Sequence, residues 1–298
     1  MKRSFISLLL AFVFILQCGT VALAAESETE NIYSQKATRS GQSALSVIAD
    51  PDVAQHFESI QTTNNYDIVS ATSQTVFVIN TLSEDGEVKE SRLMTNQEVA
   101  EYNARTTSLS TRANTWVGED GEEHQGGKLS IYLVVYKDSS RNYYAYGTAD
   151  WENGIYSSGE NAPASGYDFI AISWGGDGEL KNSSSSDRSI SGIYQYDQGN
   201  ISFSRAESDT YRGYCWQFNE KSGAYFADYI DCYAKLKKTY TTYQGKETNI
   251  RLTYIHTYQS SVGAVSFEGG SSGVAAGVSL SSCDKQWQIE IDVPGIYY

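Results

Sequence analysis

Two short runs of this chain are apolar on both faces of an extended backbone, and they restrict the fold more than any other feature. They are KLSIYLVVYK, residues 128–137, and DFIAISW, residues 168–174. Successive side chains of a strand point to opposite sides, so a strand that is apolar at nearly every position must be covered on both faces. We therefore expect both runs to be central strands of a layered β structure.

A third strand is expected over residues 249–258, where apolar and polar residues alternate. Ile250, Leu252, Tyr254 and His256 share one face, so His256 is expected to point inward. Residues 264–280 then alternate again around the glycine-rich stretch 268–273. This pattern predicts a hairpin with one apolar face and one face of Gly, Ala and Ser.

Aromatic residues divide the chain into two parts of different composition. All five Trp and 20 of the 23 Tyr follow residue 113, where helical periodicity nearly vanishes and about ten strands alternate with polar turns. We expect residues 114–298 to form a large antiparallel β domain, a β-sandwich with a jelly-roll-like arrangement. Residues 228–238 fit a strand better than a helix, because their apolar side chains share one parity.

Residues 25–104 predict a small α+β unit. Asp50 and Pro51 are suited to the N-cap and the first position of a helix, and Thr95–Glu98 resembles a capping box that opens a second helix. A hairpin turn is expected at Asp85-Gly86 between them. Residues 105–113 have no periodicity and predict a linker, so the preceding unit is interpreted as a removable pro-region or a permanent accessory domain.

The first 24 residues have the three parts of a secretory signal peptide. Basic residues at positions 2 and 3 precede an apolar run over 5–16, and Ala22-Leu23-Ala24 follows as a cleavage site. We therefore expect an exported protein. Cys18 offers an alternative, lipid attachment at the cell surface. The apolar run is shorter than the roughly 20 residues of a membrane-spanning helix, and no other stretch reaches that length.

Charge and cysteine content restrict the partners and the means of stabilisation. The net charge of -14 argues against nucleic acid, whose phosphates favour basic proteins. Without the signal peptide, Cys215, Cys232 and Cys283 remain, which allows one internal disulfide at most, and the strand register favours Cys232–Cys283. A packed core must therefore supply most of the stability.

Catalytic and cofactor motifs are scarce. The chain contains no nucleophile elbow, zinc-protease motif or phosphate loop, so no cofactor is expected. His256 is the histidine that a strand positions, and we interpret it as a core residue, with a general base as the alternative. Glu220 follows Trp216 and Phe218 on one strand face; a salt bridge is its simpler role, and one half of a glycosidase carboxylate pair is the alternative.

The densest cluster of acidic residues lies in one short segment. Glu119, Asp120, Glu122 and Glu123 provide the oxygen ligands that calcium prefers, but their spacing matches no known calcium loop. The Asp120-Gly121 pair is typical of a tight hairpin turn. We therefore predict a turn here and no metal site.

The abundance of tyrosine and tryptophan is the main indication of function. Such rings are flat and apolar with a polar edge, which suits them to bind sugars or proteins, although they also fill cores. We selected Trp151, Trp216, Tyr143 and Tyr144 as binding residues. The sequence thus predicts a secreted, non-enzymatic module for glycan or cell-envelope partners; the alternatives are a polysaccharide-acting hydrolase and a pore-forming protein that inserts residues 260–281 as a hairpin.

Overall fold

A computed structural model gives the structure of the chain in twelve segments. The described residues are 32–108, 115–119, 121–152, 166–176, 179–182, 184–194, 202–219, 221–222, 225–239, 245–259, 263–270 and 273–298. The expected signal peptide with Cys18, and also Asp120 and Glu220, lie outside these segments. From Tyr33 onward the chain forms one compact unit.

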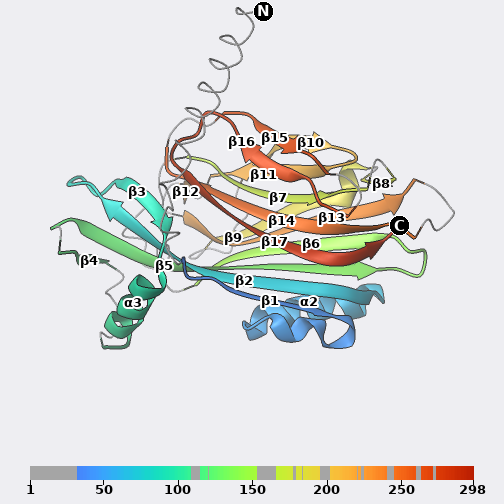
Figure 1. Ribbon diagram of the computed structural model, residues 1–298, viewed down its shortest axis with the longest axis horizontal. Coiled ribbons are helices and arrows are strands. Elements are labelled where there is room, and N and C mark those ends of the chain that lie inside the picture. Colours follow the sequence, from blue (N-terminus) through green and yellow to red (C-terminus); the bar gives the residue numbers. More distant parts are fainter. Residues whose placement is uncertain are drawn as a thin grey trace, which may run out of the picture. The chain divides into compact units, whose positions relative to one another are not determined.

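Most of this unit consists of antiparallel strands in two large sheets and one small one (Figure 1). The first, sheet 1, follows the order β1 (Gln35–Ser40), β2 (Asp67–Leu82), β5 (Glu123–Lys137), β6 (Tyr143–Glu152), β13 (Tyr225–Lys238), β12 (Lys221–Ser222). Four short strands extend it: β3 (Val88–Leu93) on β2, β4 (Thr115–Val117) on β5, and β8 (Leu180–Lys181) and β9 (Arg188–Tyr194) on β13.

The second large sheet, sheet 2, follows the order β10 (Phe203–Asp209), β11 (Gly213–Phe218), β7 (Asp168–Trp174), β14 (Glu247–Thr257), β17 (Gln286–Tyr297). The small sheet is the hairpin of β15 (Val265–Glu268) and β16 (Gly277–Leu280). The helical segments are η1 (Gly41–Val47), α2 (Pro51–Asn64), α3 (Asn96–Ser108) and η2 (Ser185–Asp187). The predicted mainly-β, antiparallel class is confirmed, whereas the jelly-roll connection stays a prediction.

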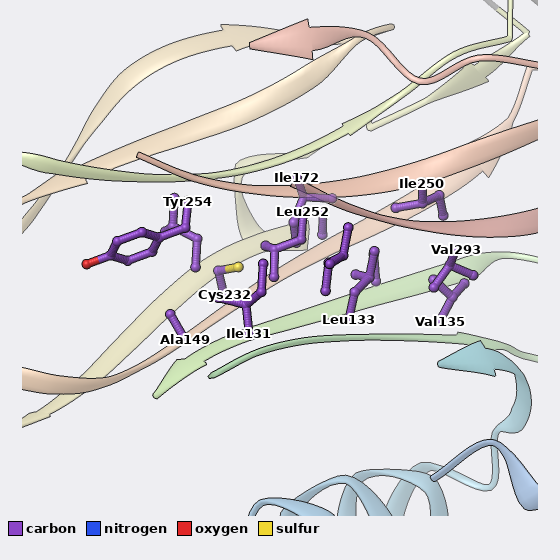
Figure 2. Close-up of a cluster of buried hydrophobic side chains, with 14 of the residues drawn as sticks. Ile131, Leu133, Val135, Ala149, Ile172, Cys232, Ile250, Leu252, Tyr254 and Val293 are labelled. Carbon is purple, nitrogen blue, oxygen red and sulfur yellow. The ribbon is translucent and has the colours of Figure 1, made fainter. Parts of the chain in front are cut away.

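The main core lies between the two large sheets. Figure 2 shows side chains of sheet 1, such as Leu133 on β5, pointing toward side chains of sheet 2, such as Leu252 on β14. The sheets approach closely, because a Cβ atom added to Gly147 would lie 2.5 Å from a methyl carbon of Leu252. Glycine at this position therefore lets the two sheets pack in direct contact.

Strands β5 and β7, which are apolar on both faces, are central as predicted. Each large sheet is covered by another layer on its outer face as well. The outer side chains of β5, including Tyr132 and Tyr136, pack against α2. Those of β7, Phe169 and Ala171, pack against the β15–β16 hairpin. Figure 1 shows the resulting layers: helix, sheet 1, sheet 2 and hairpin. Both faces of β5 and β7 are thus buried, which explains their sequence pattern.

The expected separate N-terminal unit is wrong. Strand β2 pairs with β5 from Asp67 opposite Lys137 to Leu82 opposite Glu123, with one register shift between Ile68 and Ser70. The segments before and after the predicted linker therefore share one sheet. Helix α3 also extends to Ser108 and includes the first residues of that linker. The prediction failed because a change of aromatic content along the chain says nothing about which strands pair in space.

We expect a truncated chain that begins at Thr115 not to fold. It lacks β2, so the backbone edge of β5 and the inner core residues around it are exposed. A chain that begins at Tyr33 is the matched control and should melt cooperatively. Circular dichroism during heating measures both, and a cooperative transition of the 115–298 chain would contradict the single unit.

The capping box predicted at the start of α3 is confirmed. The backbone N–H of Thr95 donates to Glu98 Oε2 at 2.8 Å, and the N–H of Glu98 donates to Thr95 Oγ1 at 3.3 Å. Arg92 also donates to the Glu98 carboxylate, with Nη1···Oε2 at 2.9 Å. The hydrogen bond from Arg92, opposed in part by burial, lowers the pKa of Glu98 from 4.5 to about 2.

Glu98 should therefore contribute acid-sensitive stability. Its folded-state pKa lies below its ordinary value, so the contribution is complete above about pH 4.5 and is lost as the pH falls toward 2. Because Arg92 is 41% exposed, we expect only about 1–2 kcal/mol. Glu98→Gln should lower the unfolding free energy by that amount at pH 7 and flatten its decrease below pH 4.5, measured by urea unfolding. Glu101→Gln, on the same helix, is the control; an identical pH profile for the parent and Glu98→Gln would contradict the assignment.

Candidate functional site

His256 belongs to a buried hydrogen-bond network centred on the carboxylate of Asp168. Asp168 Oδ2 accepts from the Tyr254 hydroxyl at 2.5 Å and lies 3.1 Å from His256 Nδ1. Its Oδ1 accepts from the backbone N–H of Thr257 at 3.0 Å. The side chains of His256 and Asp168 are 2% and 1% exposed. A carboxylate this deep needs such partners, because an unpaired buried charge costs several kcal/mol.

Aromatic residues connect this network to both large sheets. Trp151 on β6 donates from Nε1 to the Tyr254 hydroxyl at 3.2 Å, and the Trp287 ring lies 4.9 Å from the ring of His256. Trp287 in turn donates from Nε1 to Ser91 Oγ on β3 at 2.9 Å. The network therefore joins sheet 1 to sheet 2, and His256 occupies the position of a core residue.

Replacing His256 should thus affect stability. His256→Ala removes a buried hydrogen-bonding group and its ring contacts, which should cost about 1–3 kcal/mol of unfolding free energy. His124→Ala, on a half-buried residue that contacts Thr81 Oγ1 at 3.2 Å, should cost less. Urea unfolding compares the two variants. A His256→Ala protein as stable as the parent would show that the network is not structural.

Three of the four residues selected as binding residues are core residues. Trp151, Trp216 and Tyr143 are 6%, 4% and 6% exposed and belong to the cluster between the sheets. Rings buried to this degree present no face to a ligand, so their predicted binding role is wrong. The fourth, Tyr144, points to the opposite side of β6, onto the outer face of sheet 1, but it is only 5% exposed, so the same conclusion holds for its ring.

The predicted acidic candidates do not form a site in the described part of the chain. Glu119 is exposed, and the Glu122 carboxylate pairs with Lys89 beside the turn in which Gly118 N–H donates to the Glu122 carbonyl. Glu123 lies on β5 opposite Leu82. Among the residues that the structure describes, no group of three or more His, Cys, Asp or Glu side chains is arranged to hold a metal ion.

The Cys232–Cys283 pairing, which the sequence favours for a disulfide, is not formed. Cys215, Cys232 and Cys283 are free thiols and all are buried. Cys232 lies in the core between the two large sheets, whereas Cys283 lies in the cluster on the other side of sheet 2. A whole sheet therefore separates the two sulfur atoms, which shared parity in the sequence does not reveal.

The outer face of sheet 1 carries a group of tyrosines on β6 and β13 that pack against the cluster formed with helix α2. On β6 and β13 the register places Tyr144 opposite Lys235, Tyr146 opposite Tyr233, and Thr148 opposite Asp231. Tyr66, just after α2, stacks on Tyr144 with 4.2 Å between ring centroids. We call this group the tyrosine face; Tyr144 and Thr148 in it are buried, and its half-buried members are Tyr66, Tyr146, Tyr229, Asp231, Tyr233 and Lys235.

Tyr146 and Tyr233 form the centre of the tyrosine face. Their ring centroids are 4.8 Å apart with a 36° tilt, and both side chains are half-buried. Neither hydroxyl makes a hydrogen bond with another described residue. Burial, with a smaller contribution from Tyr66, raises the pKa of Tyr146 to about 12, so this hydroxyl stays protonated at physiological pH. The pair thus offers two partly exposed rings and two unused hydroxyls.

Asp231 marks one end of the tyrosine face. Thr148 Oγ1 donates to Asp231 Oδ1 at 2.7 Å, and His56 Nε2 on α2 lies 3.4 Å from Asp231 Oδ2. Burial raises the pKa of Asp231, against the opposing effect of His56. These partners occupy both carboxylate oxygens, so Asp231 fastens α2 to the sheet. Lys235, at the other end, lies with Nζ 5.0 Å from the centroid of the Tyr144 ring.

Only part of the tyrosine face could be predicted from the sequence. Tyr143 and Tyr144, adjacent on β6, lie on opposite faces of sheet 1, as the alternation of a strand requires. The selection missed Tyr146 and Tyr233, because their contact depends on the register of β6 against β13. The repeat Tyr144, Tyr146 on one strand and Tyr229, Tyr233 on another is the pattern that points to them.

Comparison with known proteins does not assign the chain to a family. No family model matches the chain, and no curated protein matches it. In the described part of the chain, every helix is too short or too polar to cross a membrane.

Proposed function

We propose that this protein is an exported, non-enzymatic binding protein that holds a glycan of the cell surface or cell envelope on the tyrosine face. The observation that carries the proposal is the half-buried pair Tyr146 and Tyr233, whose rings are partly exposed and whose hydroxyls are unused among the described residues. Export rests on the first 24 residues, which have the pattern of a signal peptide.

A sugar ring matches the chemistry of this pair. One face of a pyranose is formed by C–H groups, which pack on a flat aromatic ring, while its hydroxyls at the rim hydrogen-bond to polar groups nearby. Tyrosine supplies both a ring and a hydroxyl with only two side-chain torsions to fix. A protein partner also uses tyrosine, but it favours a larger apolar centre than the two rings found here.

The site is also held rigidly before a ligand arrives. Tyr146 lies on β6 and Tyr233 on β13, two paired strands inside sheet 1, and Tyr146 packs edge-on against Tyr136 at 5.7 Å. Tyr136 is fixed in turn by its hydroxyl, which donates to the Phe57 carbonyl on α2 at 2.9 Å. Because these rings are already ordered, binding loses little side-chain entropy.

Substitution of either residue of the central pair should weaken glycan binding while the fold remains. We expect Tyr146→Ala and Tyr233→Ala each to weaken binding by about 1–2 kcal/mol, or roughly 5- to 30-fold, because each removes a stacking ring. Tyr211→Ala, on a tyrosine that is 45% exposed outside this face, should bind like the parent. Pull-down on insoluble polysaccharides and purified cell walls, followed by titration with soluble fragments, measures the effect.

The same experiment separates the alternatives. Binding that the two substitutions leave unchanged would contradict the tyrosine face as the site, and absence of binding to every polysaccharide and cell wall would contradict the function. Release of soluble sugar from the polymer by the parent protein would instead favour the hydrolase alternative.

A further inference from the structure

We propose that the glycan bound on the tyrosine face is acidic and that Lys235 recognises its carboxylate or phosphate group. This inference rests on the proposed function and adds the chemical class of the ligand to it. Lys235 lies on β13 two residues from Tyr233 and on the same face of the sheet, since both alternate with the buried Ala234 and Leu236.

Lys235 is a cation whose charge no described residue neutralises. Its Nζ lies over the Tyr144 ring at 5.0 Å, and within the described segments no carboxylate approaches it to salt-bridge distance. The side chain is half-buried, so water does not solvate it completely. A lysine on a mixed-charge surface is ordinarily paired or fully hydrated, and this one is held instead against an aromatic ring at the edge of a proposed binding surface.

The neighbouring charges of the face are, by contrast, matched. Lys237, the next residue outward on β13, has its Nζ 3.4 Å from Asp187 Oδ2. Asp231 has Thr148 and His56 as partners. Lys237 and Asp231 already have partners. Lys235 is therefore the residue on this part of the face that can pair with a negatively charged ligand.

The hydrogen-bonding inventory of the face supports the same conclusion. Lys235 has three N–H donors and no acceptor, and the hydroxyls of Tyr146 and Tyr233 remain protonated because burial raises the pKa of both residues. The centre of the face therefore offers the ammonium donors of Lys235 and one O–H donor from each tyrosine. A ligand complements them best with acceptor oxygens, and carboxylate and phosphate oxygens are the strongest acceptors that a glycan carries.

The spacing fits a single sugar unit. Residues two apart on a strand are separated by about 6.6 Å, so Tyr233 and Lys235 lie close enough to contact one sugar unit together. A ring on Tyr233 would thus place its acidic group beside Lys235. The net charge of -14 opposes the approach of a long polyanion, so we expect short acidic fragments or chain ends to bind best.

The test compares one sugar backbone in charged and neutral forms. Short oligogalacturonates, the same oligomers as methyl esters, and an oligosaccharide bearing a phosphodiester are titrated calorimetrically against the parent and three variants. We expect the parent to prefer a charged form at least 10-fold over the ester. Lys235→Gln should abolish this preference while binding of the ester persists, and Lys235→Arg should retain it.

Lys237→Gln is the matched control, because it removes the same charge from a neighbouring lysine that is paired with Asp187. It should leave the preference unchanged. A preference for uronate identifies a carboxylate as the natural group, and a preference for the phosphodiester identifies a phosphate; either result supports the inference.

Two results would overturn the inference. Equal binding of charged and neutral forms by the parent would refute the acidic class while leaving the proposed glycan function intact. An equal loss of preference in Lys235→Gln and Lys237→Gln would show general electrostatics in place of recognition by Lys235. Failure of the parent to bind these probes and every polysaccharide would instead refute the proposed function itself, and the inference with it.

Discussion

Burial of β5 and β7 on both faces is the constraint on which the rest of this structure depends. Each strand presents one apolar row to the core between the large sheets and a second row outward, so each large sheet requires another layer. Helix α2 supplies that layer over β5, and the β15–β16 hairpin supplies it over β7. The tyrosine face continues this outer layer onto β6 and β13, where the outward residues include tyrosine, threonine and charged side chains.

The hydrogen-bond clusters around Asp168 and Asp231 have different roles, because they lie in different layers. The carboxylate of Asp168 is inside the sandwich, where hydrogen bonds from Tyr254 and the Thr257 backbone compensate for its lost hydration. The carboxylate of Asp231 is at the outer surface, where it ties His56 of α2 to β13. The first cluster stabilises the contact of the sheets, and the second fixes α2 to the outer face of sheet 1.

Local signals in the sequence predicted local structure well. The Asp50 cap, the box at Thr95–Glu98 and the central position of β5 and β7 were all readable, because each depends on neighbouring residues or on simple alternation. Pairing in space was not readable. The Ser- and Thr-rich sequence of β2 did not reveal its long pairing with β5. The alternation of side chains also did not show which face of β6 is the core face, and Trp151 and Tyr143 lie on that face.

The position of Lys235 follows from the chain of contacts that holds Tyr144. The Tyr144 hydroxyl donates to Asp138 Oδ2 at 2.8 Å, and Asn142 donates to the same carboxylate. Although burial acts to raise the pKa of Asp138, these hydrogen bonds keep it below its ordinary value, so the carboxylate stays ionised. A charged acceptor draws the hydroxyl proton and enriches the ring in electrons, which strengthens its attraction for the ammonium group above it. Lys235 is thereby positioned in advance, and its charge remains available to an anion approaching from the solvent side.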